Sequence, residues 1–268
     1  MVLEEFENTV EFNGTRYVAE LPLKYETAFI PDHFNIAFKR LESLHMNLFL
    51  RDPVLEIDYY KIFTDYEKEG IIEKVFDHGV PGKTSYLPHR PIVRVDKDTT
   101  KVRPVFDGSA HEKGGKSLND YLHPGPALLQ LIFDIVIRSC FKKILITADI
   151  RQAYLNIEIS DKHKDLLRFL LVDQENQSQV QKYRFNRAVF GVNCMPFILG
   201  ATIIQHMNAL KGQNEQWDEF VEQFLRDLYM DDEMTAFDDV EDGKRFYDFS
   251  KKALADAGLD LRKWESNS

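Results

Sequence analysis

Cysteine is scarce in this chain of 268 residues, which contains only Cys140 and Cys194, far apart in the sequence. No paired His/Cys spacing of the kind that binds zinc accompanies them. The composition therefore argues against a zinc site, and two isolated cysteines are typical of a reducing compartment. Internal repeats and low-complexity tracts are lacking as well.

Long hydrophobic runs are also missing. The longest apolar stretch covers residues 188–204 and is shorter than the roughly 20 residues that a membrane-spanning helix needs. It is interrupted by Gly191, Asn193, Pro196 and Gly200. The N-terminal residues 1–7 are acidic and lack the basic-then-apolar pattern of a secretion signal. We therefore expect a cytoplasmic chain that is not secreted and has no membrane partner.

The chain lacks the net positive charge that is usual for an autonomous nucleic-acid binder. Its 44 Asp and Glu residues outnumber 34 Lys and Arg residues, which gives a net charge of −10. Residues 90–116 are nevertheless net basic, so contacts with a nucleic-acid duplex are expected from this segment or from neighbouring domains. Hydrophobic residues make up 44% of the chain, enough for one large core or two joined subdomains.

The most informative motif is Tyr229-Met230-Asp231-Asp232. Apolar side chains at helical spacing precede it over residues 217–228 and predict a helix. A short strand over residues 228–230 would then deliver both acids to a tight hairpin at the rim of a sheet. Two adjacent carboxylates in that position are what a magnesium-dependent polymerase needs at its catalytic turn. The alternative is that the acids mark an exposed turn.

A third carboxylate, Asp149, follows a β-branched run over residues 144–148 that predicts a buried strand ending in this acid. Because burial of an unpaired carboxylate is unfavourable, such an acid is usually neutralised by a metal, a cation or hydrogen bonds. Two hard cations about 3.5–4 Å apart can activate a 3′-hydroxyl and stabilise departing pyrophosphate. Mg²⁺ suits oxygen ligands, and Mn²⁺ is the alternative ion. Taken singly, Asp149 also fits a strand that ends at a turn.

Six segments together carry a resemblance to a known family. Three resemble the palm motifs of reverse transcriptases, in the right order: ITADI at residues 146–150, FGVNCMP at 190–196 and YMDD at 229–232. Three more resemble the polymerase region of BEL/Pao-type LTR retrotransposons: LPHRP at 87–91, SLND at 117–120 and LRKWESN at 261–267. The resemblance implies an RNA-directed DNA polymerase (reverse transcriptase) domain and extends from about residue 12 to the C-terminus.

The resemblance also assigns roles to single residues. It implies that Asp149, Asp231 and Asp232 hold two catalytic Mg²⁺ ions, with the carbonyl of Ile150 as a further ligand. Tyr154 matches the aromatic gate that lies under the incoming sugar, where a ring would clash with a 2′-hydroxyl. Without the resemblance, Tyr154 would be interpreted as a core tyrosine.

Contacts to the dNTP are implied elsewhere in the chain. Arg103 and Lys101 match the fingers hairpin that grips the triphosphate, and a guanidinium fork suits phosphate oxygens. A solvated charged turn is the alternative there. Phe190 and Gly191 match the loop that supports the incoming nucleotide, where Gly191 would let the backbone approach the ligand closely. Lys263 matches a general acid that protonates the departing pyrophosphate. The alternatives are that the arginine before it has this role, or that Lys263 is a plain surface lysine.

The expected fold class is α+β, a right-hand polymerase palm and fingers with an N-terminal helical and hairpin extension. The extension is predicted over residues 1–70, the fingers over 71–140, and the palm over 141–268 with part of the fingers inserted around 155–190. Asn13-Gly14 predicts a hairpin. Helices are predicted over residues 32–50, 53–69, 127–138, 197–210 and 245–257. A thumb is expected to be absent from this chain and to follow residue 268.

The implied partners are an RNA or DNA template, a primer strand and dNTPs. Protease, RNase H and integrase domains are expected on the same polyprotein. Virus-like particles are a further expected location. Two other function classes stay open. A truncated, non-catalytic remnant that binds nucleic acid or protein would suit the acidic charge, although the intact set of three acids disfavours it. A two-metal nuclease explains the acids but neither Tyr154 nor the loop at residues 190–196.

Overall fold

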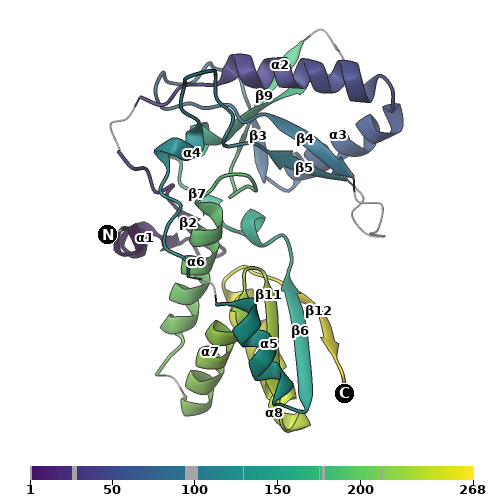
Figure 1. Cartoon of the computed structure of the whole chain (residues 1–268). Coiled ribbons are helices and arrows are strands. Elements are labelled where there is room, and N and C mark those ends of the chain that lie inside the picture. Colours follow the sequence, from purple (N-terminus) through teal and green to yellow (C-terminus); the bar gives the residue numbers. More distant parts are fainter. Residues whose placement is uncertain are drawn as a thin grey trace. The chain divides into compact units, whose positions relative to one another are not determined.

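The computed structural model describes residues 2–25, 29–93, 102–128, 130–174, 176, 179–212 and 214–268. The chain forms two compact units, between which it passes repeatedly (Figure 1). Unit 1 comprises Met1–Ala19, Gly125–Ile157 and Pro196–Ser268, and unit 2 comprises Glu20–Pro124 and Glu158–Met195. No helix within the described ranges has the length and apolar character needed to cross a membrane.

Unit 1 is built on a four-stranded antiparallel sheet with the strand order β10-β11-β6-β12. These strands are β6 (Ile144–Ile150), β10 (Leu228–Tyr229), β11 (Asp232–Phe237) and β12 (Leu261–Ser266). Helices α5 (Ile132–Cys140), α7 (Glu215–Asp227) and α8 (Val240–Asp256) contact the sheet. The unit also contains α1 (Val2–Thr9), the hairpin of β1 (Glu11–Phe12) and β2 (Tyr17–Ala19), the 3₁₀ helix η2 (Ala153–Asn156) and most of α6 (Met195–Ala209).

The two faces of this sheet differ in burial, because side chains alternate between the faces along each strand. Thr235 and Phe237 of β11 point to the face that the helices cover. Phe237 packs against Phe246 of α8 with ring centroids 5.2 Å apart, and the Thr235 hydroxyl donates a 2.9 Å hydrogen bond to Asp227 at the end of α7. Asp232 is exposed on the opposite face. The buried face therefore fixes which side chains of β11 reach solvent.

Unit 2 contains a three-stranded antiparallel sheet with the order β3-β9-β8 and a separate hairpin of β4 and β5. Its strands are β3 (Ile72–Val75), β4 (His89–Val93), β5 (Val102–Phe106), β7 (Glu158–Ile159), β8 (Arg168–Val172) and β9 (Val180–Phe185). Its helices are α2 (Phe34–Leu44), the π-helix η1 (His45–Phe49), α3 (Pro53–Lys68), α4 (Leu118–Tyr121) and the 3₁₀ helix η3 (Lys164–Leu167).

Aromatic side chains form the core of unit 2 between α3 and the strands. Phe63 of α3 packs on Phe169 of β8, and Phe106 of β5 packs on Phe185 of β9, with ring centroids 5.4 and 4.9 Å apart. His89, the histidine of the LPHRP motif, lies among these rings, and burial lowers its pKa to about 4. His89 is therefore a neutral core residue.

The α+β class is confirmed, and most of the expected elements are present with shifted ends. The helix expected over residues 53–69 is α3, where the Asp52 side chain accepts a 3.0 Å hydrogen bond from the nitrogen of Leu55 as an N-cap. The helix expected over residues 245–257 starts earlier, at Val240, because Asp239 caps it in the same way. The Asn13 hairpin is confirmed by the pairing of β1 with β2.

One expectation about local structure is wrong. The helix expected over residues 127–138 begins only at Ile132, because Leu131 has an extended backbone with ψ of 125°. Prolines at positions 124 and 126 also disfavour helix in the segment before it. Just before β1, residues Val2–Thr9 form the helix α1, for which no separate prediction was made. Local patterns thus located the elements better than their ends.

A buried acid lies beneath the sheet of unit 1. Glu233 of β11 is 1% exposed, and neither of its carboxyl oxygens has a hydrogen-bond partner in the described part of the chain. Burial, and to a smaller extent the neighbouring Asp227, raises the pKa of Glu233 well above its usual range, although Arg226 opposes the shift. Ionisation of this group therefore destabilises the folded state.

The substitution Glu233→Gln tests this effect through the pH dependence of stability. The folded protein keeps a proton that the unfolded chain releases as the pH rises above the ordinary value of 4.5. The free energy of unfolding therefore declines from that pH upward until the raised pKa is passed. Gln cannot ionise, so we expect Glu233→Gln to lack this decline and to be more stable at pH 8 by on the order of 1–3 kcal/mol.

Urea unfolding between pH 4.5 and pH 8 would measure the difference, with pH 4.5 being the ordinary value of the carboxyl group. Glu265→Gln provides a matched control, since Glu265 is exposed on β12. This control should follow the unsubstituted protein at every pH. If the free energy of unfolding declines with rising pH by the same amount in Glu233→Gln and in the unsubstituted protein, Glu233 is not the source of the decline.

Candidate functional site

The hairpin of β10 and β11 brings its two acids beside Asp149 in unit 1. Asp232 of β11 is the register partner of Asp149 of β6. Directly opposed residues of antiparallel strands point to the same face, with Cβ atoms about 5 Å apart. The peptide oxygen of Asp231 accepts a 2.7 Å hydrogen bond from the nitrogen of Ile150, the residue after Asp149. The three acids therefore occupy neighbouring backbone positions.

The turn of this hairpin lies one residue earlier than the sequence indicated. Tyr229 pairs with Asp232, so Met230 and Asp231 form the turn, and Asp232 begins β11. Met230 has a φ of 58°, which L side chains seldom adopt. Asp149 likewise lies within β6 and not at its end, because the strand continues for one more residue. Both shifts place an acid in the paired part of the sheet, where its position is fixed by register.

The acids act on one another electrostatically. Partial burial of its carboxyl group raises the pKa of Asp232 above its ordinary value, Asp231 and Asp149 raise it further, and Lys263 lowers it. Burial also raises the pKa of Tyr154 to about 12, with a contribution from Asp231. The Tyr154 ring, on η2, is only 6% exposed, as the core interpretation predicts, yet its hydroxyl lies within the field of Asp231.

Two basic side chains of β12 face Asp149. The Arg262 Nε atom lies 3.5 Å from Asp149 Oδ1, and the Lys263 Nζ atom lies 3.5 Å from both carboxylate oxygens. Asp149 Oδ1 is buried and accepts no hydrogen bond from any residue that the structure describes. The negative charge of Asp149 is thus balanced by the two nearby cations more than by close hydrogen bonds.

The donor chemistry of this acidic group fits a hard divalent cation. All side-chain donors are carboxylate oxygens, which Mg²⁺ prefers. Asp149 Oδ1 lacks a hydrogen bond from the described residues, and the charges of Asp231 and Asp149 add to burial in raising the pKa of Asp232, so a cation beside these carboxylates would be stabilising. Within the described ranges, no group of three or more His, Cys, Asp or Glu side chains is placed to hold a metal ion by itself. Mg²⁺ does not require such a group, because water and substrate phosphates usually complete its shell.

Of the residues predicted to contact a dNTP, Arg103, Phe190 and Gly191 lie in unit 2, whereas Tyr154 lies in unit 1. Arg103 is exposed on β5, where it pairs with Ile92 of β4. Lys101 lies outside the described residues. Phe190 is 50% exposed, and Gly191 follows it in the loop before α6. Tyr154 therefore belongs to the same compact unit as the acids, and the other described contacts belong to unit 2.

Gly191 is required by packing within unit 2. Its φ is 98°, and a Cβ atom there would lie 2.0 Å from the peptide oxygen of Phe106. The close approach of two backbone segments therefore explains this glycine, where the sequence suggested the approach of a ligand. A side chain at this position would push the loop away from β5.

Asn119 holds the same loop, a role that the sequence did not reveal. Its Oδ1 atom accepts a 2.9 Å hydrogen bond from the nitrogen of Asn193, and its peptide oxygen accepts one of 3.0 Å from Asn193 Nδ2. Asn119 Nδ2 also donates to the peptide oxygen of Gly191 at 3.4 Å. The SLND motif contains Asn119, but no local pattern in the sequence links residue 119 to residue 193.

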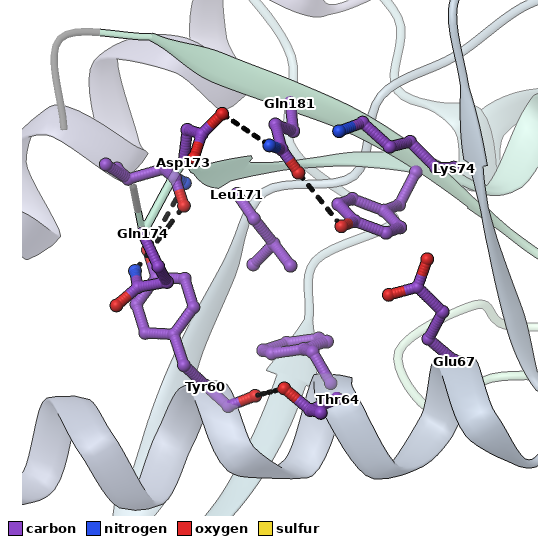
Figure 2. A pocket seen from close by; sticks show the side chains of 11 residues that line it. Tyr60, Thr64, Glu67, Lys74, Leu171, Asp173, Gln174 and Gln181 are labelled. Carbon is purple, nitrogen blue, oxygen red and sulfur yellow. Dashed lines mark hydrogen bonds between the residues drawn. The ribbon is translucent and has the colours of Figure 1, made fainter. Parts of the chain in front are cut away.

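A cavity of about 320 Å³ lies in unit 2 beside α3 and the ends of β8 and β9 (Figure 2). On its wall, Asp173 accepts a 2.5 Å hydrogen bond from Gln181, which in turn accepts one of 3.0 Å from the Tyr183 hydroxyl. None of the predicted site residues lines this cavity. It is therefore not the candidate site.

Comparison with known proteins gives a likeness of fold. No protein-family model matches the chain, and no curated protein matches its sequence. Among solved structures, the chain is similar to the foamy viral protease-reverse transcriptase dRH in complex with double-stranded DNA. The TM-score is 0.56 at 17% sequence identity, and the match covers 76% of this chain.

The chain spans only 30% of the length of that foamy viral protein. At this low identity the similarity concerns the fold and leaves chemistry to the residues themselves. The chain therefore has a mixed α+β fold of the reverse-transcriptase kind.

Proposed function

We propose that this chain is the RNA-directed DNA polymerase domain of a retrotransposon polyprotein of the BEL/Pao type. The observation that supports it most is the pairing of Asp149 with Asp232, with Asp231 in the adjoining turn, in a reverse-transcriptase-like fold. In the proposed reaction, the 3′-oxygen of a primer attacks the α-phosphate of a dNTP in line and pyrophosphate leaves. The LPHRP, SLND and LRKWESN segments favour the BEL/Pao type.

Asp149, Asp231 and Asp232 are the residues that would hold two Mg²⁺ or Mn²⁺ ions, with the Ile150 carbonyl as a further oxygen ligand. Such ions, when bound, supply an activated 3′-oxygen and charge neutralisation at the leaving pyrophosphate. The chain contributes the placement of the carboxylates. Because β6 and β11 fix two of them by register, the acids need little rearrangement to act together.

Three other side chains would act on the nucleotide. Tyr154 would exclude a 2′-hydroxyl at the sugar, and Arg103 would bind the triphosphate with its guanidinium fork. Lys263 would donate a proton to the departing pyrophosphate oxygen, since its ammonium lies beside Asp149. Lys101, Phe190 and Gly191 complete the proposed dNTP contacts.

The proposed partners are a template strand, a primer and dNTPs. The foamy viral protein of similar fold is described in complex with double-stranded DNA, which supports a nucleic-acid partner here. Since the net charge of this chain is −10, we propose that its basic segment over residues 90–116 and neighbouring polyprotein domains supply most phosphate contacts.

Primer extension on an RNA template tests the proposed chemistry. We expect Asp231→Asn to lower dNTP incorporation by more than about 100-fold, because a carboxylate ligand of the cation is lost. Asp248→Asn is the matched control, since Asp248 is exposed on α8 in the same unit, and it should incorporate dNTPs at the unsubstituted rate. Equal incorporation by Asp231→Asn and the control would refute the polymerase proposal. Template-free cleavage of DNA would instead favour a nuclease.

Binding of dNTP in the presence of Mg²⁺ separates the polymerase from a non-catalytic remnant. Arg103→Ala should weaken this binding about 10–100-fold through the loss of charge-assisted hydrogen bonds to phosphate. Lys113→Ala serves as the control, because Lys113 is an exposed cation in the same basic segment. Isothermal titration would measure both. Metal-independent binding of a protein partner, with no dNTP bound by any variant, would support the remnant.

The gate role of Tyr154 predicts a change in sugar discrimination. Tyr154→Ala should raise the ratio of ribonucleotide to deoxyribonucleotide incorporation about 10–100-fold, because the clash with the 2′-hydroxyl is removed. Tyr154→Phe keeps the ring and should keep the discrimination. If Tyr154→Ala lowers both rates equally and leaves their ratio unchanged, Tyr154 acts only as the core residue that its burial indicates.

A further inference from the structure

The strand β12 departs from regular pairing beside the acids. Arg262 is the register partner of Asp149, and Glu265 is the partner of Thr147. Three steps along β12 therefore match two steps along β6, which leaves one extra residue on β12 in a β-bulge. Lys263 lies inside this bulge and has a φ of 52°, in the left-handed region. Figure 1 shows β12 alongside β6.

The bulge decides where the Lys263 side chain points. In a regular strand, residues 262 and 263 would face opposite sides of the sheet. Here Arg262 and Lys263 both reach Asp149, with nitrogen-to-oxygen distances of 3.5 Å for each. Trp264 instead packs on Tyr247 of α8, with ring centroids 4.6 Å apart, so it takes the helix-covered face. The extra residue thus places a second cation on a single carboxylate.

These two cations lie beside a carboxylate oxygen of Asp149 that lacks a hydrogen bond from the described residues. This oxygen, Oδ1, is buried, and both basic side chains lie within ion-pair distance of it. The Lys263 side chain is 61% exposed, so it can leave Asp149 for solvent without disturbing the core. Ion pairs of this kind, partly exposed and longer than close hydrogen bonds, are weak enough to be exchanged.

We propose that Arg262 and Lys263 are built-in counter-cations of Asp149, which occupy its carboxylate until a divalent cation displaces them. The bulge in β12 is the device that makes this possible, because it turns Lys263 to the face of the acids. The inference rests on the proposed function, since it concerns the same acids as ligands of the cation. Its consequence is a coupling: a divalent ion bound to Asp149 releases Lys263 for another anion, such as a phosphate oxygen.

Binding of Mn²⁺, followed by electron paramagnetic resonance of the free ion and without any nucleotide, tests the proposal independently of activity. Lys263→Gln and Arg262→Gln should each bind Mn²⁺ about 2–5-fold more tightly than the unsubstituted protein, and the double variant about 10-fold. Lys263→Gly, which tolerates the left-handed backbone, should match Lys263→Gln. Lys263→Arg restores the charge and should return the affinity to near the original value.

Two controls separate the possible failures. Lys252→Gln removes an exposed charge from α8 without touching Asp149 and should leave the affinity unchanged. Asp149→Asn should lose most of the binding. If Asp149→Asn binds poorly but Lys263→Gln and Arg262→Gln bind no more tightly than the unsubstituted protein, the counter-cation role is refuted and the metal site stands. If Asp149→Asn binds Mn²⁺ as well as the unsubstituted protein, the proposed metal site itself is refuted.

Discussion

The antiparallel pairing of β6 with β11 is the constraint on which the candidate site depends. Its register sets Asp149 opposite Asp232, and a slip of one residue would turn every side chain of β11 to the other face. Such a slip is opposed by Thr235 and Phe237, which are buried on the helix-covered face. The apolar packing of one face of the sheet therefore holds the acids in place on the other.

The same alternation explains how unit 1 distributes its negative charge. Asp232 and Glu233 are adjacent in sequence but have opposite surroundings, one exposed at the rim and the other buried. The raised pKa of Glu233 favours its neutral form, so it adds little to the repulsion among the acids above it. Asp149 is balanced differently, by Arg262 and Lys263 from a neighbouring strand. A concentrated acidic group can thus exist in a stable fold before any cation is bound.

Unit 2 positions its candidate contacts by backbone packing. Asn119 joins the loop at residues 190–193 to the segment after β5, and Gly191 permits the close approach to Phe106. The likeness to a foamy viral protease-reverse transcriptase concerns the arrangement of such elements, whereas chemistry has to be argued from side chains. The proposal of a polymerase therefore depends more on the acids of unit 1 than on the likeness itself.

The local features of this protein can be predicted from its amino-acid sequence. Apolar spacing located α7, Asp52 and the proline after it located the start of α3, and the order of motifs singled out the acids, because periodicity and capping act within a few residues. The folded chain is needed to show that Asp149 faces Asp232, that Lys263 turns toward Asp149 in a bulge, and that Asn119 holds a distant loop. Register and bulges arise from contacts between segments far apart in the chain, so they cannot be predicted from a short stretch of sequence.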